Sequence, residues 1–255
     1  MGILDILKSL VLETKKINVS KLPSQGLFYN EDFEIRIKKA TIEDIIEYEH
    51  RYDRNNLISA IECIKRIVKK NVVLSNNYTY DYIKSVDIIF IFLEIVKFTN
   101  KKKIEVSYIN SFGKEDYVTF DEEHFKYFDF TPYLKFYNSD KKEIEINGYR
   151  FSLPSIGVET ALTSYLSTKN DECEAKKLSK VSYDFMFFLG NKSYISNSEI
   201  DNLISIFNYD LDEVEISKIK NIVDRFKGIV GYTLMIDGKE VEMKSKINLP
   251  DIFKV

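Results

Sequence analysis

The chain has 255 residues, of which 44% are apolar and 30% charged, and these values fit a globular protein of one large domain or two small ones. Its net charge of −3, with acids and bases interspersed, excludes a general electrostatic attraction to nucleic acid or to an anionic membrane. The longest apolar run, Ile88–Val96, is far too short to span a bilayer, so we expect a soluble protein. Two isolated cysteines, Cys63 and Cys173, predict neither a disulfide framework nor a metal knuckle and favour a reducing cytosol.

The first expected element is an amphipathic helix over residues 3–14. Its apolar residues recur at helical spacing: Ile3, Leu4, Leu7, Leu10 and Val11. The polar stretch Glu13–Ser20 follows, so residues 1–20 are interpreted as an arm separate from a single body at residues 21–255. The arm either folds back on its own body or binds a neighbouring subunit, and Ile3 and Leu7 are its candidate partner-binding residues. Its mixed charges disfavour a membrane-surface helix.

The segment Leu22–Tyr29, with the sequence LPSQGLFY, predicts a rigid corner. Pro23 fixes its own φ and pushes Leu22 towards extended geometry, and Gly26 can adopt a left-handed turn at little steric cost. The apolar and aromatic end of the corner is expected to pack either against the core of the chain or against another subunit. The candidate partner-binding residues here are Leu22, Pro23, Gly26, Leu27, Phe28 and Tyr29.

A helical block is expected over residues 41–100. A short strand at residues 34–37 precedes it, and Thr41 is a good N-cap for a helix that runs to about Tyr52. Two further helices are expected, over Asn56–Lys69 and over Asp81–Thr99. The second half of the last helix is nearly all apolar, which predicts the centre of a helical core.

Two hairpins are expected next, within residues 104–152. Apolar and polar residues alternate with period two around Gly113, and Asn147-Gly148 is a strong hairpin turn signal. A second helical block is expected at residues 156–228, with helices over about 171–189, 196–208 and 211–227. A C-terminal hairpin at residues 231–247 follows, turned by Asp237-Gly238, and then a tail in which Phe253 is a candidate partner-binding residue.

This order of elements predicts an α+β fold in which helical blocks alternate with antiparallel β-hairpins, preceded by the amphipathic arm. The pattern LPSxG occurs twice, at residues 22–26 and 153–157. The sequences that flank the two copies differ, so an internal duplication is the less favoured explanation. The simpler interpretation is that the same residues turn the chain at two element boundaries.

The sequence contains no recognisable catalytic, cofactor or metal motif. His50 and His124 lack the i, i+4 histidine partner of a helical zinc site and are interpreted as surface imidazoles. Cys63 lies within an apolar helical pattern and is interpreted as a core residue, whereas acids flank Cys173 and disfavour its thiolate. We therefore expect no enzyme activity, no cofactor and no metal.

An alternative is a nucleic-acid-processing accessory protein, such as a degenerate metal-dependent nuclease. Asp237 precedes Glu242 and Lys244 on an expected strand, and alternating carboxylate and lysine can hold Mg²⁺ and a water. The basic clusters lie at element boundaries: Lys69-Lys70, Lys101–Lys103 and Lys141-Lys142. Lysines at helix ends complement the helix dipole, so nucleic-acid binding is the less favoured interpretation. A host-directed regulator from a phage or mobile element is a third class that the sequence leaves open.

The pattern LPSxGxxY at residues 22–29, followed by a short strand and by the acidic helix start at Thr41, resembles the opening motif of a phage protein family. These are the baseplate and baseplate-hub assembly proteins of T-even-like contractile-tailed bacteriophages. The order of blocks, the strand that runs into Leu153-Pro154 and the C-terminal Leu249-Pro250 are also similar. The specific part of the resemblance is limited to the eight residues of the motif.

The resemblance implies a non-enzymatic structural or assembly protein of a contractile tail. Its partners would be other tail or baseplate proteins, with no nucleic acid and no membrane, and its location the virion baseplate or the host cytoplasm during assembly. Many members of the family carry paired cysteines in the middle hairpin, in an arrangement that resembles a zinc knuckle. Residues 104–120 contain no cysteine here, which implies a hairpin held by apolar packing without zinc.

Overall fold

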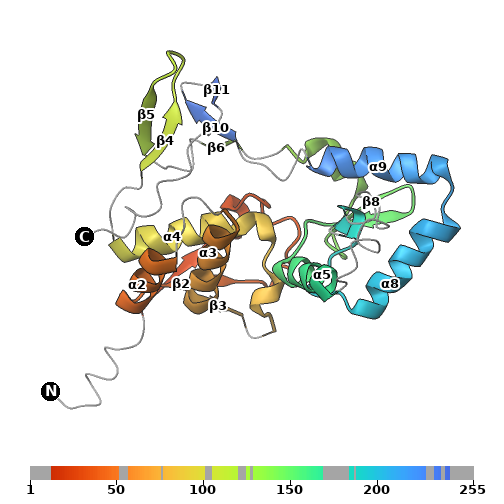
Figure 1. Ribbon diagram of the computed structural model, residues 1–255, viewed down its shortest axis with the longest axis horizontal. Helices are drawn as coiled ribbons and strands as arrows, with labels where there is room; N and C mark the ends of the chain where they lie inside the picture. The colour runs from red at the N-terminus through yellow and green to blue at the C-terminus, as the bar shows by residue number, and fades with distance from the viewer. Residues whose placement is uncertain are drawn as a thin grey trace.

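The computed structural model describes residues 13–51, 57–75, 77–100, 105–119, 125–126, 129–168, 184–186, 188–227, 233–236 and 239–241. The described residues form an α+β fold of helices and antiparallel sheets of two or three strands, which confirms the expected fold class. Figure 1 shows one group of helices around α2 (Ile42–Arg51), α3 (Leu57–Asn71) and α4 (Ile88–Asn100), and two small sheets beside α4. A second group lies around α5 (Ile156–Thr168), α8 (Asn197–Ser205) and α9 (Glu213–Lys227).

The first half of the fold is a three-stranded sheet covered by three helices. Its strands are β1 (Thr14–Ile17), β2 (Ile35–Lys38) and β3 (Val72–Leu74), in the order β1-β2-β3. Its helices are α2 (Ile42–Arg51), α3 (Leu57–Asn71) and α4 (Ile88–Asn100). Ile35 and Ile37 of β2 are fully buried on the face that packs against the helices, as period-two alternation requires.

Two expectations for this half need correction. The polar stretch Glu13–Ser20 does not separate an arm from the body, because its residues Thr14–Ile17 form β1 and pair along β2. The helix expected over Asp81–Thr99 begins only at Ile88 and follows two short 3₁₀ turns. The cause of the second difference is tertiary: Lys84 is extended and forms a β-bridge with Ser155, which removes it from any helix.

The helix start at Thr41 is confirmed and has a simple local cause. The backbone N–H of Thr41 donates to the Asp44 carboxylate at 2.9 Å, and the N–H of Asp44 donates to the Thr41 hydroxyl at 3.2 Å. This reciprocal pair satisfies donors that the first helical turn leaves unpaired.

Two hairpins lie beside α4, next to the first group of helices (Figure 1). One consists of β4 (Glu105–Ile109) and β5 (Glu115–Thr119), and the other of β10 (Thr233–Ile236) and β11 (Lys239–Val241). The C-terminal hairpin also pairs with β6 (Phe125–Lys126), so chain segments distant in sequence share one sheet. Tyr108 of β4 is buried in the core of the first half, and Val118 of β5 packs against that core. The β4–β5 hairpin is thus joined to the body by apolar contacts.

The second half combines a small sheet with helices. Its strands are β7 (Tyr137–Asn138), β8 (Glu143–Ile146) and β9 (Tyr149–Phe151), preceded by the 3₁₀ segment Thr131–Phe136. Its helices are α5 (Ile156–Thr168), α8 (Asn197–Ser205), the π-helical turn η6 (Ile206–Asp210) and α9 (Glu213–Lys227). The Asn147-Gly148 turn is confirmed, with both residues at positive φ (54° and 81°). The helix expected at residues 171–189 lies mostly outside the described residues.

Three clusters of buried apolar residues organise the described parts of these halves, and the smallest lies around α5 and α8, with Val158, Leu162, Tyr165, Met186, Ile195 and Ile200. The first core contains buried apolar residues of the β1-β2-β3 sheet and of α2 to α4, together with Tyr108 and Ile156. The second core is mainly aromatic and consists of Phe28, Phe130, Ile144, Phe151, Leu153, Phe185, Phe188, Phe207, Ile219, Ile222 and Val223. Phe28 is distant in sequence from every other member of the second core, so the N-terminal corner completes a core that the rest of the chain builds later.

Candidate functional site

The corner at residues 22–29 is a series of tight turns. Backbone N–H groups of Gln25, Leu27 and Tyr29 each donate to the carbonyl oxygen three residues earlier, at 2.7, 3.2 and 3.2 Å. Gly26 has φ of 73°, as expected for a left-handed turn. A Cβ at Gly26 would lie 3.4 Å from Val19, which is an ordinary contact, so the positive φ and not the space favours glycine here.

The apolar residues of the corner are buried in the first and second cores. Leu22 and Tyr29 belong to the first core, and Phe28 belongs to the second. The Tyr29 ring stacks on Phe33 with centroids 4.2 Å apart, whereas the Phe28 ring meets Phe130 edge-on at 5.6 Å. The prediction that Leu22, Phe28 and Tyr29 bind a partner is therefore wrong, because their side chains are inaccessible; the alternative, that the corner serves the chain's own core, is correct for these residues.

The other predicted partner-binding residues have different positions. Pro23, Gly26 and Leu27 are half-buried in the same corner, and the carbonyl oxygen of Leu27 accepts a hydrogen bond from the Tyr137 hydroxyl. Ile3, Leu7 and Phe253 lie outside the described residues.

Asp87 connects the corner to the start of α4. Its carboxylate accepts from the backbone N–H of Ser24 at 2.9 Å and from the Tyr29 hydroxyl at 2.7 Å, and the hydroxyl in turn accepts from the backbone N–H of Lys84 at 2.9 Å. Asp87 is fully buried. Burial raises the pKa of this carboxyl to about 6, although the hydrogen bonds from Tyr29 and Ser24 oppose the shift.

Lys84 is the second buried charge. Its Nζ donates to the side-chain carbonyl of Asn191 at 2.6 Å and lies 3.4 Å from the Ser152 hydroxyl. Burial lowers the pKa of this ammonium to about 7, and the negative charges of Asp87 and Glu143 oppose the shift.

Glu143 of β8 completes the cluster. One carboxylate oxygen accepts from the backbone N–H of Asn191 at 2.8 Å, and the other lies 3.8 Å from a guanidinium nitrogen of Arg150 without a hydrogen bond. We call the whole cluster the polar seam: Ser24, Tyr29, Lys84, Asp87, Glu143, Ser152 and Asn191. It lies at the boundary of the two cores, since Ile83 packs in the first and Val86 packs against the second.

The two LPSxG copies contact the same segment, Ile83–Asp87. The first copy reaches Asp87 through the Ser24 N–H. The second brackets the other end: the N–H of Ser85 donates to the carbonyl of Pro154 at 2.9 Å, and the N–H of Ile156 donates to the carbonyl of Ile83 at 2.9 Å. The repeated pattern is therefore architectural, as the sequence indicated, and its two copies bind the two ends of one segment, in which extended residues lead into a 3₁₀ turn at Ser85–Asp87.

Lys84 and Asp87 have no exposed surface, so neither of these two side chains can contact a ligand in this conformation. No pattern in the sequence distinguishes Lys84, Asp87, Glu143 or Asn191 as members of a site. Each is a common surface residue type in a local sequence without a motif, so only the tertiary fold distinguishes it.

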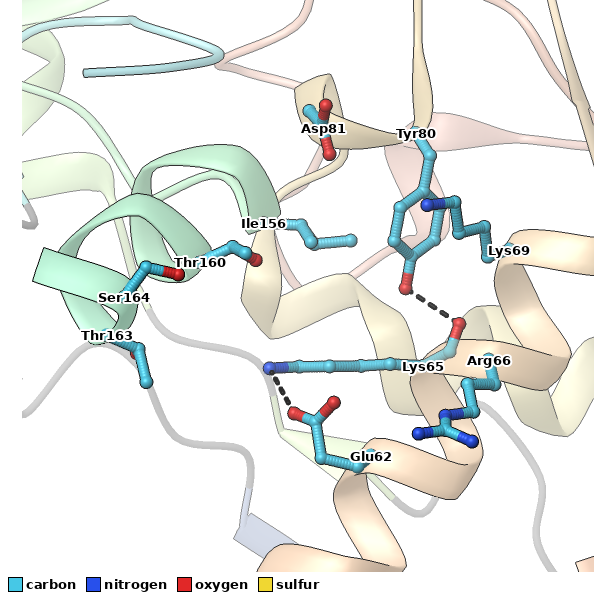
Figure 2. A pocket seen from close by; sticks show the side chains of 10 residues that line it. All are labelled: Glu62, Lys65, Arg66, Lys69, Tyr80, Asp81, Ile156, Thr160, Thr163 and Ser164. Atoms are coloured by element: carbon cyan, nitrogen blue, oxygen red, sulfur yellow. Dashed lines mark hydrogen bonds and ion pairs between the residues drawn. The ribbon is translucent and has the colours of Figure 1, made fainter. Parts of the chain in front are cut away.

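An open cleft of about 380 Å³ lies between α3 and α5. Figure 2 shows the residues that line it: Glu62, Lys65, Arg66, Lys69, Tyr80, Asp81, Ile156, Thr160, Thr163 and Ser164. The Lys65 ammonium lies 3.3 Å from a carboxylate oxygen of Glu62 and 3.3 Å from one of Glu159, and the Lys69 ammonium lies 5.7 Å from the centre of the Tyr80 ring. Acids and bases are thus mixed in the cleft, which gives it no clear preference for a charged ligand.

The basic clusters of the alternative interpretation are partly engaged within the chain. Lys70 pairs with Glu47 at 2.7 Å and with Asp44 at 3.4 Å, and Lys142 lies 3.8 Å from Glu31. Residues 101–103, Asp237, Glu242 and Lys244 lie outside the described residues.

Cys63 is buried and His50 is exposed, as predicted, whereas Cys173 and His124 lie outside the described residues. Within the part of the chain that the structure describes, no group of three histidine, cysteine, aspartate or glutamate side chains is placed to hold a metal ion. Among the same residues, no helix combines the length and apolar character needed to cross a bilayer.

The tip of the β4–β5 hairpin carries an aromatic side chain in solvent. Asn110 organises the turn, since its side-chain oxygen accepts from the N–H groups of Phe112 at 2.9 Å and Lys114 at 3.1 Å. Phe112 is 85% exposed, and Tyr117 on β5 is also exposed. The hairpin thus presents an exposed phenyl ring at its tip.

Comparisons with protein-family models, with curated proteins and with solved structures found no match to the chain. The resemblance to phage baseplate proteins therefore depends on the motif at residues 22–29 and on the order of the elements, and it stays a prediction.

Proposed function

We propose that the chain is a non-enzymatic structural or assembly protein of a contractile phage tail, which acts by contacts with other tail or baseplate proteins. The observation that carries the proposal is the β4–β5 hairpin, which extends from the body (Figure 1) and presents Phe112 at its tip. Exposed aromatic side chains on an ordered scaffold are frequent centres of protein interfaces, because they bury a large area at a small cost in entropy.

The motif that carries the family resemblance supports the same proposal. Its residues form the corner that joins the first and second cores, with Gly26 at positive φ and the Tyr29 hydroxyl in the polar seam. A motif with this role would be retained for architecture, which fits a structural protein. On this proposal the corner supports the contact surface and does not form it.

The first experiment tests the class of function. A stop codon in the gene, in a phage that carries it, should yield particles without functional baseplates in electron micrographs, and a plasmid copy should restore them. Tails of normal appearance would contradict the proposal. Mass spectrometry of purified virions then distinguishes a resident subunit, which stays in the particle, from an assembly factor, which leaves it.

The second experiment tests the contact surface. Phe112→Ala should weaken binding to the baseplate partner by about 2 kcal/mol, or roughly 30-fold in Kd, as for the truncation of an aromatic anchor. Tyr209→Ala is the matched control, because Tyr209 is 83% exposed but lies on η6, outside the hairpin. Equal affinities for Phe112→Ala and the unmodified chain in isothermal calorimetry would exclude the hairpin tip as the contact.

A further inference from the structure

Helix α2 has an uncovered apolar stripe opposite its buried face. Tyr48 is fully buried and Ile45 packs against the first core, whereas Ile42 is 77% and Ile46 is 48% exposed. Ile42 and Ile46 are four residues apart, so their side chains lie on the same side of the helix one turn apart. Charged residues surround this pair in the sequence of α2, which makes the two isoleucines a distinct apolar stripe.

The chain enters β1 beside the start of this helix. β1 and β2 are antiparallel with Thr14 opposite Lys38, and the Glu13 carboxylate forms an ion pair with the Lys39 ammonium. Glu13, the first residue that the structure describes, therefore lies beside the segment that leads from β2 into α2.

The sequence before Glu13 has the chemistry that this stripe needs. Its apolar residues recur at helical spacing: Ile3, Leu4, Leu7, Leu10 and Val11. We propose that residues 3–11 pack these side chains on the Ile42–Ile46 stripe of the same chain, antiparallel to α2. Along any α-helix, two residues that are four positions apart differ by a rise of about 6 Å. An apolar pair with this spacing in the segment therefore has the same spacing as Ile42 and Ile46 on α2.

The short connection between residues 3–11 and β1 favours binding of this segment to its own chain over binding to a second copy. Only Leu12 and Glu13 separate Val11 from the first residue of β1. Such a short tether keeps the segment at an effective concentration in the millimolar range near its own α2. The inference concerns the isolated chain and does not depend on the proposed role in tail assembly.

The absence of tryptophan from the sequence makes a direct test possible. In Leu7→Trp the introduced indole is the sole one, and its fluorescence reports the environment of the segment. The expected emission is blue-shifted from that of free tryptophan and is protected from quenching by iodide. Adding Ile42→Asp and Ile46→Asp should move the emission to the solvent value and remove the protection. Val214→Asp, a change at an exposed position on α9, is the matched control and should leave the emission unchanged.

Three results would overturn the inference. Solvent-like emission from both Leu7→Trp and Leu10→Trp would mean that the segment does not pack on the isolated chain. A blue shift that survives the two aspartates, with unchanged far-ultraviolet circular dichroism, would place the segment on another surface. A blue shift lost on dilution from micromolar to nanomolar concentration would identify a second copy as the occupant.

Discussion

Tyr29→Phe removes one hydroxyl from the polar seam and leaves the ring in place. That hydroxyl donates to the Asp87 carboxylate at 2.7 Å and accepts from the backbone N–H of Lys84 at 2.9 Å. The ring stack on Phe33, with centroids 4.2 Å apart, depends on the phenyl group and should persist. The variant therefore isolates two buried hydrogen bonds from the packing of the first core.

The expected loss follows from the two bonds. A hydrogen bond to a charged group contributes about 1.5–3 kcal/mol, and a buried N–H left without a partner costs about 1–3 kcal/mol. We expect Tyr29→Phe to lower the free energy of unfolding by about 3–4 kcal/mol at pH 8, where Asp87 is ionised. Burial raises the pKa of Asp87 to about 6, so at pH 5 the native carboxyl is mostly neutral. The loss at pH 5 should therefore be about 1–2 kcal/mol smaller.

Urea denaturation at pH 8 and pH 5, followed by circular dichroism, measures both values. Tyr117→Phe is the matched control, because Tyr117 is exposed on β5 and the same substitution there should change stability by less than about 0.5 kcal/mol. If Tyr29→Phe were as stable as the unmodified chain at pH 8, the polar seam would not hold the two halves together. A loss that is equal at both pH values would show that Asp87 does not titrate in this range.

Two further predictions concern the same region. Phe28→Ala removes a fully buried ring and should lower the free energy of unfolding by about 3–5 kcal/mol. The control Phe112→Ala removes an exposed ring and should change the free energy of unfolding by less than about 0.5 kcal/mol. Equal urea midpoints for the two variants would contradict the burial of Phe28. Lys84→Met tests the buried ammonium, whose pKa falls from 10.5 to about 7 because of burial. Between these two values the unfolded chain binds more protons than the native chain, so Lys84 makes stability rise with pH by up to about 1.4 kcal/mol per unit. When the free energy of unfolding is plotted against pH, the difference between the unmodified chain and Lys84→Met should show this slope. Parallel plots for the two proteins would refute the prediction.

Local signals in the sequence predicted much of the fold. Thr41 and Asp44 are three residues apart at a helix start, and Asn147-Gly148 lies between two alternating runs. In both cases the contacts that determine the local structure are between residues close in sequence, so the helix start and the turn can be predicted from the local sequence alone. The hairpin around Gly113 was predictable for the same reason.

Features set by distant contacts were not predictable in this way. The sequence of Thr14–Ile17 is mostly polar, because Ile17 is the one residue of β1 that is buried. The pairing of β1 with β2 is a contact between distant residues and leaves no local pattern in the sequence. Lys84 lies in a stretch that favours helix, but its bridge to Ser155 overrides that tendency. The corner was identified correctly as rigid and aromatic. Its sequence could not reveal whether the aromatic residues face the chain or a partner, because both need the same apolar surface.

Phe28 and Tyr29 are neighbours in the sequence but belong to different cores, and this has a consequence for how the chain is made. The remaining members of the second core, from Phe130 to Val223, are synthesised long after Phe28 has left the ribosome. The second core therefore cannot complete its packing until Val223 has been made, and Phe28 stays open to solvent or to a chaperone meanwhile. Closing this core brings the N-terminal corner onto chain that is synthesised much later.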